Sequence, residues 1–237
     1  MHAKSSGFTL IEIAIVLVII GLLLGGVLKG QELITGARVR NLISQQDGIK
    51  AAFFGFQDRY RALPGDYASA STNINCSGAT CLDGNGNGRI EAPTTGVRED
   101  IIAWSHLTAA GFLNGSYSAS SASASTDPTD PTNPKNPYSI YLQIVYDNNY
   151  GTGTPPAKHN LKTGGQIPVE IIAEVDRKID DGSPYSGAFQ FSTYIPAVTG
   201  YTAPAASTGG GNVGCVSAAS AWDIQSGSTN CGAASLF

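Results

Sequence analysis

Hydrophobic residues are concentrated near the start of the chain, in one long apolar run. The 21 residues from Phe8 to Leu28 include a single charged side chain, Glu12. A helix of that length is long enough to cross the hydrocarbon core of a bilayer. The short segment before it, residues 1–7, carries Lys4 as its only fully charged side chain. Because flanking positive residues favour the cytoplasmic side, we expect a cytoplasmic N-terminus and a C-terminal bulk on the other side.

After this span the apolar residues narrow to a single stripe. They recur at steps of seven, four, three, four and three, at Leu42, Ile49, Phe53, Phe56, Tyr60 and Leu63. Such spacing predicts an amphipathic continuation of the helix over residues 29–64, stopped by Pro64-Gly65. We expect the stripe to hold a globular head, residues 65–237, against the helix. An aromatic-lined ligand groove is the alternative interpretation of the same stripe.

The head combines helical and strand patterns in an α+β arrangement. Two further helices are predicted, at Glu99–Ala110, where Gly111 is placed to cap the end, and at Pro168–Ile179, where proline stands in the first turn. Two strands are predicted, at Tyr138–Tyr146 and Phe189–Tyr194. The low-complexity segment 116–137, rich in Ser, Ala, Thr and then Pro, is expected to be an exposed or disordered loop.

The composition argues against nucleic-acid binding and against catalysis. Charged residues make up 14% of the 237 residues, below the usual figure of about 25%, and the net charge is -4. There is no run of Lys or Arg that would hold phosphates. The histidines, His2, His106 and His159, lack the spacing of a triad or a zinc site, and neither a phosphate loop nor a GxSxG sequence occurs. We therefore do not expect an enzyme.

The four cysteines indicate disulfides in an oxidising compartment. Cys76, Cys81, Cys215 and Cys231 form no CxxC pair and have no histidine cluster nearby, so zinc is poorly supported. Four cysteines allow three pairings. The spacing favours the local ones, Cys76–Cys81 and Cys215–Cys231, and an exported head would supply the compartment in which they form.

The carboxylate of Glu12 distinguishes the apolar run from a plain signal anchor. An acidic residue within such a span costs roughly 2.5–3.5 kcal/mol on insertion scales, so it usually has a function and a partner. A positive group at the same depth in a neighbouring copy would serve. A free α-amino group at Phe8, created by cleavage after Gly7, would be that group.

The sequence around Glu12 resembles a known processing motif. Residues 4–12, KSSGFTLIE, followed by the apolar run, are similar to the leader and cleavage/methylation motif of type IV pilins and type II secretion pseudopilins. The resemblance implies that Gly7 precedes the cut, that Phe8 becomes the N-methylated first residue, and that Glu12 is the glutamate at the fifth mature position. Many pilins carry a kinking proline where this chain has Lys29; here Gly25, Gly26 and Gly30 would weaken the helix instead.

The same resemblance implies a fold, a function and partners. It implies a long helix backed by a small antiparallel sheet, with a leader at 1–7 and a membrane-spanning filament core at 8–28. The subunit would lie in the bacterial inner membrane with a periplasmic head, be cut by a prepilin peptidase, and polymerise with other pilins or pseudopilins through an assembly ATPase and platform protein. The sequence leaves pilus and secretion pseudopilus open. The alternative is a single-span anchored binding or enzymatic domain outside any filament.

One loop of the head is a candidate calcium site. The run DGNGNGRIE, residues 83–91, places oxygen ligands at alternate positions, as in the first half of an EF-hand loop. The ligands would be Asp83, Asn85, Asn87, the carbonyl of Arg89, and Glu91. The twelfth position is Thr94, so Glu91, Glu99 or Asp181 would have to supply the remaining charge. Pseudopilins and some related pilins hold calcium in their heads; an Asx-rich turn without metal is the alternative.

Overall fold

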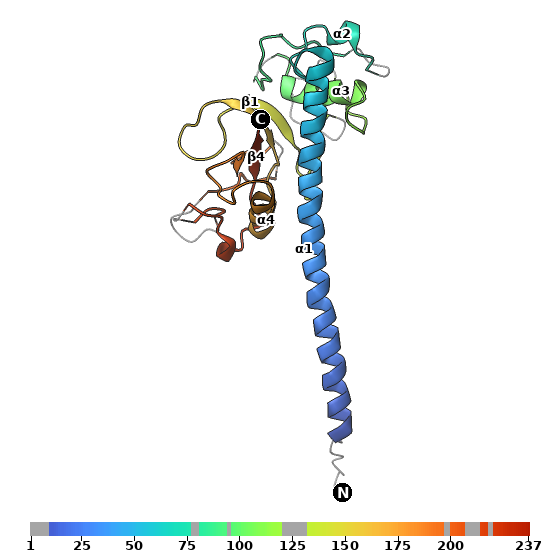
Figure 1. Cartoon of the computed structure of the whole chain (residues 1–237), viewed down its shortest axis with the longest axis vertical. Helices are drawn as coiled ribbons and strands as arrows, with labels where there is room; N and C mark the ends of the chain where they lie inside the picture. Colours follow the sequence, from blue (N-terminus) through green and yellow to red (C-terminus); the bar gives the residue numbers. More distant parts are fainter. Residues whose placement is uncertain are drawn as a thin grey trace. The chain divides into compact units, whose positions relative to one another are not determined.

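The computed structural model describes residues 10–76, 81–93, 96–119, 132–196, 200–206, 214–217 and 220–237. Within these residues the elements follow the order α1 (Leu10–Tyr60), α2 (Ala70–Asn73), α3 (Glu99–Ala109), β1 (Gln143–Asp147), β2 (Lys158–Lys162), α4 (Val169–Ile179), β3 (Phe189–Phe191), η2 (Ile224–Ser226) and β4 (Ala233–Leu236) (Figure 1). The α+β class expected from the sequence is confirmed. The chain divides into two compact units, residues 1–38 and residues 39–237.

The first unit contains the apolar part of α1. Its side chains are exposed on every face of the helix, with Leu10 at 92% and Leu22 at 73%. Among the described residues, α1 is the one helix long and apolar enough to cross a membrane by length and composition. The helix passes through Gly25, Gly26 and Gly30 without interruption. Lys29 forms an exposed ion pair with Glu32 at 2.6 Å.

In the second unit, the remainder of α1 supplies the predicted stripe. Leu42, Ile49, Phe53 and Phe56 are at most 3% exposed, whereas Tyr60 and Leu63 are only half-buried. The helix ends at Tyr60, four residues before Pro64. Arg61 adopts a left-handed conformation (φ 53°) and its N–H donates to the Gln57 carbonyl at 2.9 Å. A left-handed residue after the last turn is a common helix stop, so the proline is not needed to end α1.

The four strands form one antiparallel sheet in the order β1-β2-β4-β3. β1 pairs with β2 from Gln143↔Lys162 to Asp147↔Lys158, and β4 lies between β2 and β3. The sequence predicts β1 and β3, although both are shorter than expected, and it misses β2 and β4. β2 is KHNLK, which lacks apolar alternation, and β4 is AASL, whose small side chains carry little strand signal.

The core of the second unit consists of two main clusters. One joins the apolar face of α4 to β3 and to the segment that contains both Cys215 and Cys231. The other joins the α1 stripe to α3 and to β1 and β2, with Phe56, Trp104 and Leu142 completely buried. The α1 stripe therefore packs against the interior of the second unit.

Residues 132–136 differ from the exposed loop expected at 116–137. Residues 120–131 lie outside the described part of the chain, but Thr132, Asn133 and Asn136 are at most 4% exposed. The Asn136 side chain is the reason that this segment can be buried. It accepts the N–H groups of Tyr138 and Ile140 and donates to the carbonyls of Thr163 and Gly165, at 2.8–3.2 Å. Polar backbone that would otherwise need water is thus satisfied inside the protein.

The cysteines form the two local pairs that their spacing favours. Cys76–Cys81 joins Cα atoms 5.4 Å apart and Cys215–Cys231 joins Cα atoms 5.7 Å apart. Both cysteines of the second pair are fully buried within the α4 cluster. Cys231 also exchanges backbone hydrogen bonds with Ile167, at 2.8 and 3.2 Å, just before α4. The second disulfide therefore fixes a glycine-rich tail to the head.

Replacing Cys215 and Cys231 together with serine should lower the free energy of unfolding by about 3 kcal/mol. Closing a loop of about 15 residues is worth that much in the chain-entropy model, and buried serines add an unfavourable polar term. Chemical denaturation of the full chain in detergent measures the change. The Cys76→Ser/Cys81→Ser variant is the matched control and should lose less, because its loop is shorter. A larger loss in the control would contradict the expectation that the Cys215–Cys231 disulfide stabilises the head more than the Cys76–Cys81 disulfide does.

Candidate functional site

The candidate assembly segment is the first part of α1. Gly7 and Phe8, the proposed cleavage and methylation residues, lie outside the described part of the chain. Glu12 lies in the first turn of α1. A carboxylate at this position is costly, because it places a charge among aliphatic side chains.

Four glycines in this segment lie in open space as far as the described residues extend. Gly21, Gly25, Gly26 and Gly30 would each accept a Cβ with nothing within 4 Å. Interior helix glycine costs about 1 kcal/mol relative to alanine, so its repeated use is unfavourable for an isolated helix. The pairs Gly21/Gly25 and Gly26/Gly30 are two consecutive GxxxG patterns. Such patterns let helices in an apolar medium approach closely. These two GxxxG patterns are visible in the sequence and could have predicted a helix-packing surface.

The candidate calcium loop, residues 83–91, is mostly exposed, and its side chains are engaged in hydrogen bonds within the protein. Asp83 accepts hydrogen bonds from the backbone and the hydroxyl of Ser71, at 2.7 and 2.8 Å, which lower the pKa of its exposed carboxyl. The side-chain amides of Asn85 and Asn87 donate to Glu91, at 3.3 and 3.0 Å. Their carbonyl oxygens lie in Asx turns, the Asn85 oxygen accepting from Asn87 N–H and the Asn87 oxygen from Arg89 N–H. Calcium at residues 83–91 therefore stays a prediction.

Two buried carboxylates from outside the loop hold its backbone. Asp66 accepts the N–H groups of Asn87 and Gly88, at 2.9 and 2.8 Å. Glu99 accepts those of Asn85 and Glu91, at 2.9 and 3.0 Å, and burial raises the pKa of its carboxyl. A Cβ at Gly84 would collide with the carbonyl oxygen of Gly65, so the two backbones are in direct contact. The glycines of this loop permit close packing.

His106 joins the backbone segments on either side of this loop, at Gly65 and Leu82. Its Nδ1 accepts the Gly65 N–H at 3.0 Å, and its Nε2 lies 2.8 Å from the Leu82 carbonyl oxygen. Because the Gly65 N–H can only donate, the proton belongs on Nε2. The ring is fully buried, and burial lowers its pKa to about 4 although the Leu82 carbonyl opposes the shift. His106 is thus a neutral bridge between two backbone segments. His159, the other described histidine, accepts the Ile90 N–H at 3.3 Å.

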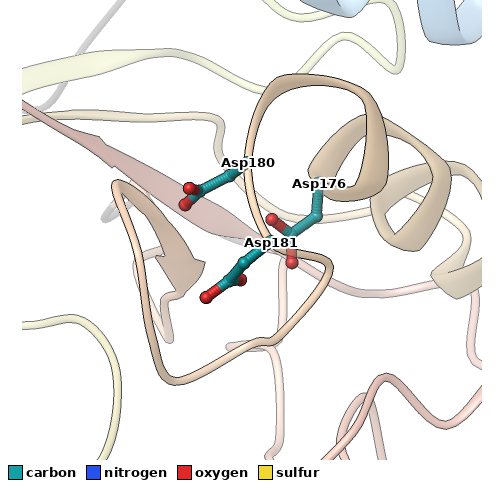
Figure 2. A group of neighbouring side chains, drawn as sticks. All are labelled: Asp176, Asp180 and Asp181. Atoms are coloured by element: carbon teal, nitrogen blue, oxygen red, sulfur yellow. The ribbon is translucent and has the colours of Figure 1, made fainter.

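The carboxyl end of α4 carries a cluster of carboxylates that sequence analysis missed as a group. Asp176, Asp180 and Asp181 each offer an oxygen within 4.8 Å of the others (Figure 2). Of these three residues, the sequence suggests only Asp181, as a carboxylate that could complete the calcium site at residues 83–91. The available signal was the spacing of Asp176 and Asp180, four residues apart at a predicted helix end, which puts both on one helix face.

Comparison with known families identifies the N-terminal segment. Residues 2–28 match the family described as the prokaryotic N-terminal methylation motif. The chain carries the prepilin-type motif of type IV pilins and pseudopilins. The match begins before α1 and ends within its exposed apolar part. No curated protein and no solved structure matches the chain. The prepilin-type motif therefore covers the candidate assembly segment, and the head is interpreted from its own residues.

The head of this protein should lose stability in mild acid through His106. The unfolded histidine has a pKa near 6.5 and the folded one about 4, so the unfolded state takes up the proton first as the pH falls. The contribution of His106 is fully present above pH 6.5 and is lost between pH 6.5 and 4. The loss of stability relative to neutral pH is about 2–3 kcal/mol at pH 4.5.

The measurement compares wild type with His106→Gln, in detergent, by chemical denaturation at pH 7 and at pH 4.5. The glutamine variant should be less stable at pH 7, and the gap should narrow by about 2–3 kcal/mol at pH 4.5, because glutamine does not titrate. Other acidic groups affect both proteins equally, so they cancel in the difference. A gap that does not change with pH would show that His106 does not control the acid response.

Proposed function

We propose that this protein is a structural subunit of a type IV pilus or a type II secretion-type filament, assembled through its N-terminal helix. The observation that carries the proposal is the prepilin-type motif at residues 2–28, which overlaps the part of α1 that exposes apolar side chains on every face. The motif implies a structural protein rather than an enzyme. A helix of this kind needs an apolar environment, which the membrane supplies before assembly and neighbouring helices supply afterwards.

The glycines of α1 support close packing between copies. Removing a side chain from the helix surface lets a second backbone approach, and the gain in dispersion contacts offsets the cost of glycine in the helix. Among the described residues, no atom outside the helix's own backbone lies within 4 Å of a Cβ placed at these positions. Their use is therefore explained by contact with another helix, as the core of a filament requires.

Glu12 is proposed to pair with the α-amino group of Phe8 in an adjacent subunit. Cleavage after Gly7 would create that amine four residues before Glu12 in sequence. In an apolar filament core each charge is costly alone, and pairing offsets much of that cost. The pair would also set the axial register between neighbouring subunits, because it forms only when amine and carboxylate lie at the same depth.

The remaining partners follow from this route. The precursor would be a single-pass inner-membrane protein with a cytoplasmic leader and a periplasmic head. A prepilin peptidase would cut and methylate it, and a platform protein with its ATPase would add it to a filament of pilins or pseudopilins. A periplasmic head is consistent with two disulfides, since that compartment is oxidising.

Cells with an active prepilin peptidase should contain a mature chain that starts at N-methylated Phe8. Intact-mass and N-terminal peptide analysis of the membrane fraction would detect the loss of residues 1–7 and the gain of one methyl group. Gly7→Leu is the matched variant and should retain the leader, because the residue before the cut must be small. An intact Met1 terminus on the wild-type chain would reject processing and favour a plain membrane-anchored domain.

Glu12→Ala should leave membrane insertion intact or improved, because it removes a charge that costs roughly 2.5–3.5 kcal/mol in the span. Incorporation into filaments should fall by at least about tenfold, since the subunit amine would lose its partner. Quantifying the protein in membranes and in sheared filaments separates the two effects. Glu32→Ala, which removes an exposed acidic residue from the same helix, is the control and should assemble normally. Equal incorporation of both variants would remove Glu12 from assembly.

A further inference from the structure

The head contains asparagines that are followed directly by glycine, and all of them are exposed to water. The pairs are Asn85-Gly86, Asn87-Gly88 and Asn114-Gly115. Where glycine follows asparagine, the next backbone nitrogen can reach the carbon of the side-chain amide without hindrance, because glycine has no Cβ. Since all the pairs are exposed, access to water does not distinguish them. Their hydrogen bonds do.

The first pair of the loop 83–91 is held at both of the groups that would react. The Gly86 N–H donates to the backbone carbonyl of Asp66 at 3.0 Å. The Asn85 side chain accepts the Asn87 N–H through Oδ1 at 2.9 Å and donates to Glu91 through Nδ2 at 3.3 Å. A bonded N–H retains its proton and points at its acceptor, and a bonded side-chain amide does not rotate toward the next nitrogen. Attack of the Gly86 nitrogen on Asn85 therefore requires the loop to open.

The second pair of the loop is held in the same way, by a different part of Asp66. The Gly88 N–H donates to the Asp66 carboxylate at 2.8 Å. The Asn87 side chain accepts the Arg89 N–H at 2.8 Å and donates to Glu91 at 3.0 Å. Asp66 is 4% exposed, so water competes little for either of its contacts. Its backbone therefore protects the first pair and its side chain protects the second.

The pair that follows α3 lacks this protection. The chain is fixed as far as Leu113, whose N–H donates to the Leu107 carbonyl at 3.2 Å. Beyond it, within the part of the chain that the structure describes, neither the Asn114 side chain nor the Gly115 N–H makes a hydrogen bond. Gly115 has φ 130°, a conformation that suits glycine alone. The nitrogen of Gly115 is thus free to lose its proton, and the Asn114 side chain is free to rotate toward it.

We propose that Asn114 is a site of spontaneous deamidation, whereas the fold protects Asn85 and Asn87. The Gly115 nitrogen, after losing its proton to hydroxide, attacks Cγ of Asn114 and forms a cyclic succinimide. The Cγ–Nδ2 bond breaks, and Nδ2 takes up a proton and leaves as ammonia. Water then opens the ring at either carbonyl, which gives aspartate or isoaspartate. The net change is one amide and one water converted to one carboxylic acid and ammonia, with no oxidation or reduction.

The product changes the surface of the head and leaves its interior alone. Either form of the product adds a negative charge at residue 114, and isoaspartate also lengthens the main chain there. Because Asn114 and Gly115 have no hydrogen bonds to lose among the described residues, the fold should tolerate the change. Modified copies would therefore accumulate with the age of the protein. In a filament outside the cytoplasm this fraction would follow the age of the subunit, a consequence that rests on the proposed function, whereas the reaction itself does not.

The test incubates the full chain in detergent at mildly alkaline pH and follows aspartate and isoaspartate at each asparagine by peptide mass spectrometry. In the folded protein Asn114 should react at least about tenfold faster than Asn85 or Asn87, because the loop must open before it can react. In denaturant the three rates should lie within about threefold of one another, since the protection is then lost. Asn114→Gln is the matched control and should remove the main product, because its longer side chain closes a less favourable ring.

Asp66→Asn separates the two kinds of protection in the loop. It keeps one acceptor oxygen but removes the one that holds either Gly88 or its neighbour, so Asn87 should react faster. Asn85 should stay slow, because Gly86 is bonded to the Asp66 backbone, which the substitution leaves in place. Equal acceleration at Asn85 and Asn87, or none at either, would overturn the assignment of protection to these bonds. Equal rates at all three asparagines of the folded wild type would overturn the proposal, as would an Asn114 that reacts only in denaturant.

Discussion

The buried stripe of α1 is the surface on which the head is built. Between Val39 and Phe56 one side of the helix is almost completely removed from water, and the main core clusters both include residues from it. Most of the buried apolar residues of the sheet and of α4, together with Trp104 and Leu107 of α3, belong to these two clusters. Burying large side chains at about 25 cal/mol per Å² is the main favourable term available to a head with so few charges and so many small residues. Mutations in this stripe should therefore affect the whole head together.

Sequence patterns predicted what depends on periodicity and missed what depends on tertiary contact. The long helix, α3 and α4 were predicted because their apolar residues recur at the helical period, and β3 because it is aromatic. β2 was not predicted because its sequence contains a buried lysine, Lys162. The charge of Lys162 is satisfied by Asp147 and the Asn149 carbonyl, partners that no local pattern reveals. The end of α1 was predicted at Pro64-Gly65, but the helix ends at Tyr60 because Arg61 adopts the left-handed conformation. An arginine gives no sequence signal for such a stop.

The polar side chains of the head act mainly on backbone. Asp66, Glu99, His106 and Asn136 each join two or more backbone groups from segments far apart in the chain. This explains how long connections with little secondary structure can be buried at all, since each polar backbone group needs a partner. The predicted calcium loop and the observed acidic cluster are both extensions of this pattern.

The sheet order has a consequence for the timing of folding. β4 lies at the centre of the sheet, between β2 and β3, although about 70 residues separate it from β2 in the chain. Until residues 233–236 have emerged, β2 lacks its inner neighbour and β3 has no partner in the sheet. A chain that emerges from its N-terminus can form the first helix early, because helical contacts are local, but it must hold the β1–β2 hairpin with one edge open. The sheet can therefore be completed only after β4 is available to pair with β2 and β3. Until then, β2 has an unpaired edge that another chain could pair with.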